Sequence, residues 1–319
     1  IRVLSYAMPA YRSMASINLG MVCSALKNSG TDEQKQHWLP RIASGEIACF
    51  GLTEPGSGSD SAAMATTARR DGNGYVLNGS KRYITNAPHA KIGLIMARTN
   101  DEALPKNAHI SAFVVDMESA GITVGKSDHK MGQAGSHIAD IYMDDVKVPG
   151  DALLGGEEGR GFATAMQSLD NGRLSVAAAS CGYARRMLDT AVNYANERKA
   201  FGEPIAQFQL IQAMLADSEA EIYAGECMLR DASAKANLGK AIIECASTKM
   251  FASEMCGRVA DRCVQIHGGA GYLAEYEAER FFRDARIYRI FDGASEVHRS
   301  VIARCMMKGD SDLFDPWGA

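Results

Sequence analysis

The spacing of apolar residues changes twice along this chain of 319 residues, and the two changes limit the folds it can adopt. Apolar residues recur at helical spacing from residue 1 to about 47, alternate as in strands from about 48 to 155, and return to helical spacing from about 160 onward. Because the strands form one block instead of alternating with helices, the order argues against a Rossmann fold. It predicts a mainly α protein with a central β domain between helical parts.

Cap residues place the predicted helices more closely. Residues 13–28 are apolar at helical spacing, and Gly30 is typical of the left-handed residue that follows a helix. Thr31 and Gln34 in "TDEQ" match a capping box, which predicts a helix from there through Ile42. The C-terminal half shows four long helical patterns, at residues 173–198, 208–236, 241–268 and 276–290.

The block of strands is divided by turn residues. "GYVLNGSKRYIT", residues 74–85, alternates around Asn78–Gly79, which predicts a hairpin that turns at those two residues. Three further strands are predicted in "KIGLIMART", "HISAFVVDM" and "HIADIYMDDVKVPG".

Composition excludes several classes of protein. The net charge is −4 and the sequence has no apolar run of about 18 residues, so we expect neither a nucleic-acid partner nor a membrane span. The eight cysteines are scattered without a Cys-x-x-Cys pair, which favours buried thiols in a reducing compartment over a disulfide or zinc framework. The histidines show no paired metal-ligand spacing, so no metal is expected. The chain starts without methionine or a signal-peptide core, and we expect a truncated N-terminus.

One segment between helix and strand is rich in glycine and serine. In "CFGLTEPGSGSD", Gly56 and Gly58 allow a ligand to approach the backbone, and Thr53 and Ser59 add hydroxyl groups. It lacks the pattern G-x-x-x-x-G-K-[ST], so a P-loop is excluded. An ordinary loop is the alternative interpretation.

Two predicted helix ends can also be interpreted in two ways, as helix caps or as ligand-binding sites. "NERKAFGEPIAQFQ" places Arg198 at the end of a helix, where it complements the helix dipole or binds a phosphate. "VQIHGGAGY" ends another helix with Gly268 and Gly269, which cap the helix or offer N–H groups to a phosphate or ring edge.

A single carboxylate, Asp292, follows an apolar run in "RIYRIFDGASEVHR" and precedes Gly293. An aspartate in this position is the N-cap of a helix or, in an apolar pocket, a catalytic base. These residues alone leave both interpretations open.

Together and in this order, the motifs resemble those of the acyl-CoA dehydrogenase family of flavoproteins. The resemblance covers nearly the whole chain, through "GTDEQKQHWLPRIASGE", "TEPGSGSD", "NGSKRYITN", "DDVKVP", "ERKAFG", "QIHGGAGY" and "FFRDARIYRIFDG". It implies a helical N-terminal remnant (residues 1–47), a β-barrel-like middle domain (48–157) and a C-terminal four-helix bundle (158–319). It also implies that the first helices of the N-terminal domain are missing.

The resemblance implies an FAD shared between subunits of a homo-oligomer, a dimer of dimers. Positions that match flavin-side contacts are Phe50, Leu52, Thr53, Gly58, Ser59, Tyr83, Ile84 and Thr85. Positions that match contacts to the neighbouring subunit's FAD are Arg198, Phe201, Gln209, Gln265, Gly268 and Gly269. Acyl-CoA positions match Ser59, Ser136, Asp170, Arg173 and Gly293.

The family's catalytic glutamate falls on Asp292. The implied reaction is removal of the α-proton of an acyl-CoA thioester by this carboxylate, with β-hydride transfer to flavin N5. Electrons then pass to an electron-transfer flavoprotein. An apolar pocket raises the pKa of a carboxyl base toward the working pH.

The sequence departs from the family pattern in three ways. Asp292 is one methylene shorter than glutamate, and an error near 1 Å in reach can be costly. Gly172 occupies the position before Arg173 at which some members carry the base instead. Ala294 and Glu296 replace side chains that contact FAD in the family, and the acid either repels phosphates or pairs with an arginine.

Two other functions stay open. A flavin oxidase or monooxygenase on the same fold is favoured by the aspartate, because an oxidase branch of the superfamily also uses one. A catalytically impaired acyl-CoA-binding scaffold is favoured by the aspartate and by the changes at Ala294 and Glu296. The expected location is the cytoplasm of a bacterium or the mitochondrial matrix of a eukaryote.

Overall fold

The computed structural model describes residues 1–99, 106–239 and 241–307. The chain divides into two compact units. The helical unit contains residues 1–12, 131–133 and 173 onward, and the β unit contains residues 13–130 and 134–172. No helix in the described ranges is long and apolar enough to cross a membrane.

The β unit begins with helices whose ends follow local sequence signals. The helices are the part of α2 (Pro9–Ser16) from residue 13, a π-helix (Ile17–Val22), α3 (Cys23–Ser29) and α4 (Asp32–Ala43). The predicted capping box is confirmed, because Gln34 N donates to Thr31 Oγ1 at 3.2 Å and Thr31 N donates to Gln34 Oε1 at 3.0 Å. Gly30 ends α3 in an extended conformation, not the predicted left-handed one. A Cβ there would lie 2.6 Å from the Leu26 carbonyl oxygen, so close packing explains this glycine.

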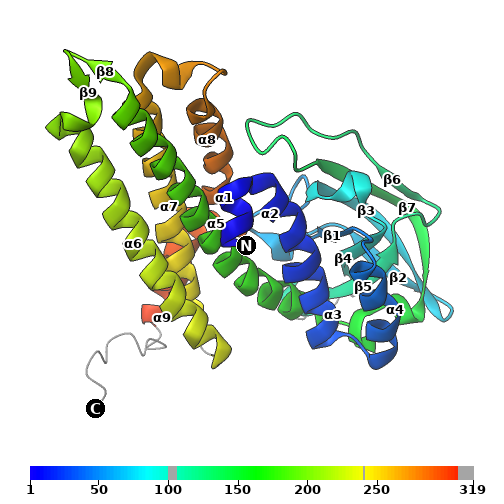
Figure 1. Ribbon diagram of the computed structural model, residues 1–319. Helices are drawn as coiled ribbons and strands as arrows, with labels where there is room; N and C mark the ends of the chain where they lie inside the picture. Colours follow the sequence, from blue (N-terminus) through cyan, green and yellow to red (C-terminus); the bar gives the residue numbers. More distant parts are fainter. Residues whose placement is uncertain (100–105, 240, 308–319) are drawn as a thin grey trace. The chain divides into compact units, whose positions relative to one another are not determined.

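The sheet of the β unit contains seven strands in the order β1-β4-β2-β3-β7-β6, with β5 beside β4. The strands are β1 (Ala48–Gly51), β2 (Thr67–Asp71), β3 (Gly74–Thr85), β4 (Ile92–Arg98), β5 (Ile110–Asp116), β6 (Ile122–Val124) and β7 (Ile138–Pro149). The sheet is curled, and α3 and α4 lie along one side of it (Figure 1). One apolar core fills the curl, and a second joins the sheet to these helices.

The predicted hairpin at Asn78–Gly79 is wrong, because β3 runs unbroken through both residues. Gly79 has φ 142° at a register shift, and a Cβ there would lie 2.7 Å from Thr66 Cα. Asn78 pairs with Asp145 on β7 through a 3.0 Å side-chain hydrogen bond. These residues therefore form a bulge between strands. The hairpin turn lies earlier, between Asp71 and Gly74, in "DGNG".

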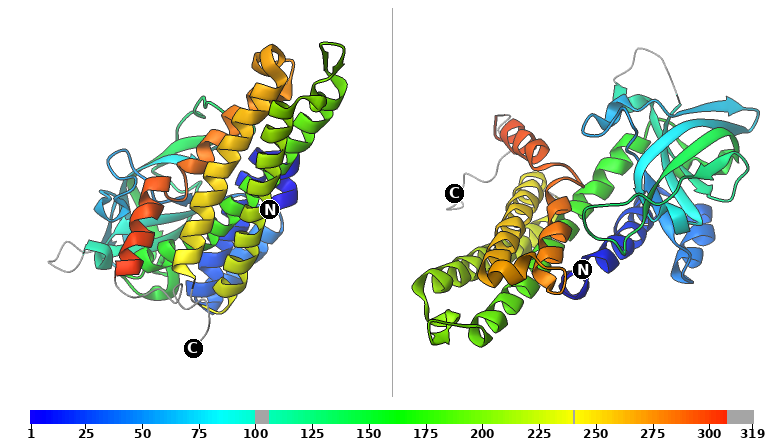
Figure 2. Two further views of the ribbon diagram at one scale, coloured as in Figure 1. Left: turned by 90° about the vertical axis from the view of Figure 1, so that its left-hand side faces the viewer. Right: turned by 90° about the horizontal axis from the view of Figure 1, so that it is seen from above.

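Long helices dominate the helical unit, where α5, α6 and α7 run side by side (Figure 2). Its helices are α1 (Arg2–Ala7), the part of α5 (Gly161–Glu197) from residue 173, α6 (Gln209–Asn237), α7 (Ile242–His267), α8 (Glu277–Ala285) and α9 (Ser295–Met307). The two-residue strands β8 (Lys199–Ala200) and β9 (Glu203–Pro204) join α5 to α6. A single apolar cluster from α5 to α8 forms its core.

The predicted fold class is confirmed, with differences at helix ends. Helix α5 begins twelve residues before the predicted start at 173, and α9 was not predicted. The helix predicted over 276–290 ends as α8 at Ala285 and continues as a 3-10 turn, Arg286–Arg289. The other 3-10 turns are Ser61–Ala63, Ala87–His89, Lys106–His109, Gly150–Ala152, Leu154–Gly156, Ile205–Gln207 and Gly268–Tyr272.

Candidate active site

A buried ion pair anchors the glycine-rich loop that follows β1. Lys81 on β3 is fully buried, and its Nζ lies 2.6 Å from Glu54 Oε1. The Glu54 carboxylate also accepts hydrogen bonds from Ala65 N at 2.5 Å and Thr66 N at 3.1 Å. Burial raises the pKa of Glu54, but Lys81 and these N–H donors outweigh it, so the pKa falls below its ordinary value. Donors from two other segments of the chain thus hold the loop in one conformation.

The far side of this loop is open. Gly58 and Ser59 are exposed, and a Cβ added at Gly56 or Gly58 would meet no atom within 4 Å. The loop therefore presents accessible backbone and a hydroxyl group. Phe50 and Leu52, which lead into it, have side chains that are more than nine-tenths buried, so only their backbone can contact a ligand.

The end of β3 lies beside β1. Tyr83 is 57% exposed with φ 61°, whereas Ile84 points into the sheet core. Thr85 is half-buried, and the next residue, Asn86, donates from Nδ2 to the Ala48 carbonyl at 3.1 Å. An exposed aromatic ring and a hydroxyl group therefore lie near the loop that leaves β1.

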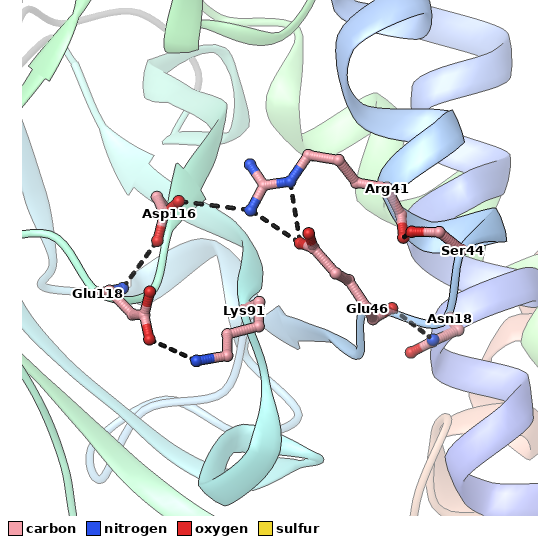
Figure 3. Close-up of polar contacts among 7 residues, drawn as sticks. All are labelled: Asn18, Arg41, Ser44, Glu46, Lys91, Asp116 and Glu118. Atoms are coloured by element: carbon pink, nitrogen blue, oxygen red, sulfur yellow. Dashed lines mark hydrogen bonds and ion pairs between the residues drawn. The ribbon is translucent and has the colours of Figure 1, made fainter.

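Polar side chains fix the start of β1 (Figure 3). Arg41, near the end of α4, donates from Nε to Glu46 at 2.9 Å and pairs with Asp116 at 3.4 Å. Asn18 Nδ2 donates to the Glu46 carbonyl at 3.3 Å, and its Oδ1 accepts from Ala48 N at 2.9 Å. This network joins the helices of the β unit to the strand that carries the candidate loop.

In the helical unit, six predicted cofactor residues share one exposed end of the bundle. This end is where α5 and α7 stop and α6 starts, next to β8 and β9 (Figure 1). Phe201 is 97% exposed at a left-handed turn, and Gly268 ends α7 with φ 59°. All six residues are exposed, namely Arg198, Phe201, Gln209, Gln265, Gly268 and Gly269.

Asp292 lies elsewhere in the helical unit, on a left-handed bend after the 3-10 turn. Asp292 has φ 52° and Gly293 has φ 93°, and a left-handed aspartate is an uncommon conformation. Lys249 on α7 donates from Nζ to the Gly293 carbonyl at 2.6 Å. Lys249 precedes Gly268, the residue after α7, by 19 positions, which corresponds to roughly 28 Å along the helix. The Asp292 bend and the exposed end are therefore two separate sites of one chain.

Three cations influence the ionisation of the half-buried Asp292 carboxyl. Burial raises its pKa above the ordinary value, while Arg12, Lys249 and Arg173 oppose that rise. Arg12 is buried, donates to Ser175 Oγ at 3.0 Å and lies 5.6 Å from the centre of the Phe291 ring. The site therefore combines a desolvated carboxyl with compensating positive charge.

A buried imidazole packs under the same bend. His298 on α9 is fully buried, and its ring would lie 3.0 Å from a Cβ at Gly293, so only glycine fits there. Burial, together with the positive charges of Lys249 and Arg173, lowers the pKa of His298 to about 4. His298 is therefore neutral at pH 7.

The remaining predicted residues are dispersed. Ala294 is half-buried, and Glu296 is exposed with Arg299 at 3.9 Å, so the acid pairs with an arginine, although weakly. In the β unit, Ser136 is buried and its carbonyl accepts from Lys130 Nζ at 2.6 Å. Asp170 and Arg173 both belong to α5.

Sequence reasoning missed Arg12, Lys249 and His298. A signal existed for Lys249, because it occupies a face of α7 whose other positions are apolar or small. That face includes Cys245, Ala246, Ala252, Ser253 and Cys256. A lysine at such a position is almost never fully buried without a partner. Arg12 had no comparable signal, because its partners come from distant parts of the sequence.

Comparison with known proteins identifies the family. Models of the acyl-CoA dehydrogenase N-terminal, middle and C-terminal domains match residues 1–46, 49–146 and 159–307. The human mitochondrial short-chain specific acyl-CoA dehydrogenase is 43% identical over 92% of this chain and 71% of its own length. The caffeyl-CoA reductase-Etf complex subunit CarC of Acetobacterium woodii is 44% identical over 88% of this chain and 74% of its own length.

Comparison with solved structures supports the same family. A Mycobacterium smegmatis glutaryl-CoA dehydrogenase in complex with FADH2 superposes with a TM-score of 0.89 at 29% identity, covering 97% of this chain and 78% of that one. The three domain models, the curated relatives and the shared fold lead to one conclusion: the chain belongs to the acyl-CoA dehydrogenase family of flavin-dependent oxidoreductases.

Proposed function

We propose that this protein dehydrogenates an acyl-CoA thioester between its α and β carbons, with Asp292 as the base that removes the α-proton. The observation that carries the proposal is the half-buried Asp292 carboxyl, desolvated on its bend yet facing Arg12, Lys249 and Arg173. The alternative base position on α5 is Gly172, which has no side chain.

The residues available fit FAD. Exposed backbone at Gly58, the Ser59 hydroxyl and the Tyr83 ring suit a flavin and its ribityl chain, and the cationic Arg198 suits a pyrophosphate. When bound, FAD would accept the β-hydrogen as hydride at N5.

The protein's own residues prepare the proton transfer. A desolvated carboxylate is a stronger base than one in water, and the nearby cations partly oppose the rise in its pKa that burial causes. The left-handed bend sets the orientation of both the side chain and the backbone N–H group of Asp292. We propose that the N–H group of Asp292 donates to the thioester carbonyl, where negative charge develops as the α-proton leaves. From the family resemblance, Ser136 in the β unit and Arg173 in the helical unit each stay proposed acyl-CoA-binding positions.

The assembly proposal follows from the two separate sites of the helical unit. Because roughly 28 Å of α7 separates Lys249 from Gly268, we propose that the exposed end contacts an FAD held mainly by another subunit. A dimer of dimers would satisfy this arrangement. Since a relative belongs to an Etf complex, we propose an electron-transfer flavoprotein as the acceptor. Because relatives are found in mitochondria and in bacteria, we propose a mitochondrial matrix or bacterial cytoplasmic location.

Anaerobic titration of the purified protein with a panel of acyl-CoAs tests the function. The panel starts with short straight chains, because one relative is named for short-chain substrates, and extends to long and branched ones. We expect a yellow protein whose flavin absorbance is bleached by at least one acyl-CoA and reoxidises slowly in air. Rapid peroxide formation would instead indicate an oxidase. A protein that stays colourless with added FAD would indicate a scaffold without catalysis.

A further inference from the structure

Lys249 contacts the backbone of the Asp292 bend and also acts on the charge of its carboxyl. It is fully buried on α7, and its ammonium donates to the Gly293 carbonyl at 2.6 Å. Arg12 instead donates to Ser175 and lies over Phe291. A hydrogen bond from an ammonium to a carbonyl is short and strong when water is excluded. This contact therefore restricts the bend on which Asp292 stands.

The bend needs such a restraint. Asp292 and Gly293 both have positive φ, and for a non-glycine residue that conformation persists only where the surroundings stabilise it. The His298 ring packs against Gly293 and blocks a side chain there. Gly293 is thus in contact with both Lys249 and His298.

The ammonium of Lys249 also acts on the carboxyl. Burial lowers the pKa of Lys249 to about 8, and among the carboxylates Asp292 opposes this most strongly, ahead of Glu254 and Glu296. Conversely, the positive charge of Lys249 lowers the pKa of Asp292 and so opposes the effect of burial on that carboxyl. The charged or titratable side chains around the bend are Arg12 on α2, Arg173 on α5, Lys249 and Glu254 on α7, Tyr288 in the 3-10 turn, and Glu296 and His298 on α9.

We propose that Lys249 is a positioning residue for the proton abstraction: it holds the Asp292–Gly293 bend through the Gly293 carbonyl and favours the ionised form of the Asp292 carboxyl. The inference rests on the proposed function in taking Asp292 as the base. Lys249 itself does not touch the reacting atoms. Its effect is to set the pH above which the base is active.

The sign of the expected pH shift follows from the charges. Removing the ammonium of Lys249 removes a stabilising cation from the ionised carboxyl, so the pKa of Asp292 rises. An opposite charge a few ångströms away lowers a carboxyl pKa by about 1–3 units, and Arg12 and Arg173 remain in the variant. We therefore expect an upward shift of about 1 unit.

The test uses the FAD-loaded protein and two readouts. The first is infrared titration of the Asp292 carboxyl, identified as the protonated C=O band that disappears in Asp292→Asn. The second is the pH dependence of anaerobic flavin reduction by an active acyl-CoA. Lys249→Met removes the donor and the charge, while Lys249→Gln removes the charge but keeps a donor. The matched control is Lys235→Met, a lysine at the end of α6 that pairs with Asp231 and Glu244.

We expect both Lys249 variants to shift the carboxyl titration and the rising limb of the rate profile upward by about 1 unit, with no shift in Lys235→Met. Carboxyl titrations of Lys249→Met and Lys249→Gln that coincide with the parent protein would overturn the inference. A parent protein that no acyl-CoA reduces would refute the proposed function instead, and the infrared titration would still decide the role of Lys249.

Discussion

Two lysines, one in each compact unit, are equally buried but differ in what they contact. Lys81 in the β unit and Lys249 in the helical unit are both fully buried, and burial lowers the pKa of each to about 8. Lys81 lies 2.6 Å from the Glu54 carboxylate. Lys249 donates over the same distance, 2.6 Å, to the neutral carbonyl of Gly293.

The difference separates a structural charge from a functional one. The charge of Lys81 is matched in direct contact, so its effect is confined to fixing the glycine-rich loop. The charge of Lys249 is not cancelled by the carbonyl, so it acts on the nearby Asp292 carboxyl. A buried cation bonded to a neutral group is costly for folding, and such sites are often functional.

The largest stability effect is expected for Lys81→Met. This change leaves the Glu54 carboxylate buried without its cation, at a cost of about 3–5 kcal/mol in the free energy of unfolding. Chemical unfolding of the parent and variant measures it. The control is Lys81→Met combined with Glu54→Gln, which removes both charges and should recover part of the loss. A single variant as stable as the parent would show that the ion pair does not hold the loop.

A smaller stability effect is expected for Lys249→Met. It leaves the Gly293 carbonyl without its donor, which costs about 1–3 kcal/mol. The same unfolding experiment should therefore rank Lys249→Met between Lys81→Met and the half-buried control Lys235→Met. A loss as large as that of Lys81→Met would mean that both lysines are structural in the same way.

Replacement of the exposed Arg198 should weaken FAD binding without changing the stability of the fold. Arg198→Ala changes an exposed residue at the end of the bundle, so the free energy of unfolding should change by less than about 0.5 kcal/mol. Loss of a charged hydrogen bond should weaken FAD binding by about ten-fold. Absorbance of bound flavin after dialysis measures occupancy. Dilution that dissociates the oligomer should also release FAD, and a monomer that retains FAD would contradict the shared site.

The smallest effect is expected for Asp292→Glu. If the bend already places the shorter side chain correctly, the added methylene overfills the site and lowers acyl-CoA affinity or flavin reduction several-fold, in line with overpacking costs of about 1–3 kcal/mol. Single-turnover reduction with the preferred acyl-CoA is the measurement. Several-fold faster reduction would show that the aspartate is too short for that substrate.

Sequence patterns predicted the elements that local rules decide. Periodicity and the Thr31–Gln34 capping box located helices and strands, because each depends on residues a few positions apart. The pattern failed at Asn78–Gly79, where contacts with Thr66 and Asp145 override a strong turn signal. Thr66 and Asp145 lie on other segments of the chain, so the pattern of residues along β3 alone cannot predict these contacts.

In the candidate site, too, features set by neighbouring residues were predictable, whereas contacts between distant segments were not. Asp292 became a candidate because an acid beside a glycine after an apolar run is visible in the sequence and because the family resemblance places the base there. Arg12 was not, since its position near Asp292 depends on how helices 280 residues apart pack together. Lys249 lies between these cases, because its helical face was predictable but its contact with Gly293 was not.

Anaerobic flavin reduction by Asp292→Asn tests the central claim, that the carboxylate beside Lys249 is the base. The amide keeps the size of the side chain but cannot accept the α-proton. FAD content and acyl-CoA binding should stay close to those of the parent protein. The rate of flavin reduction should fall by roughly 10³-fold or more, within the range of about 10²–10⁴ for loss of a general base. Near-normal reduction by the variant would contradict the account and place the base elsewhere.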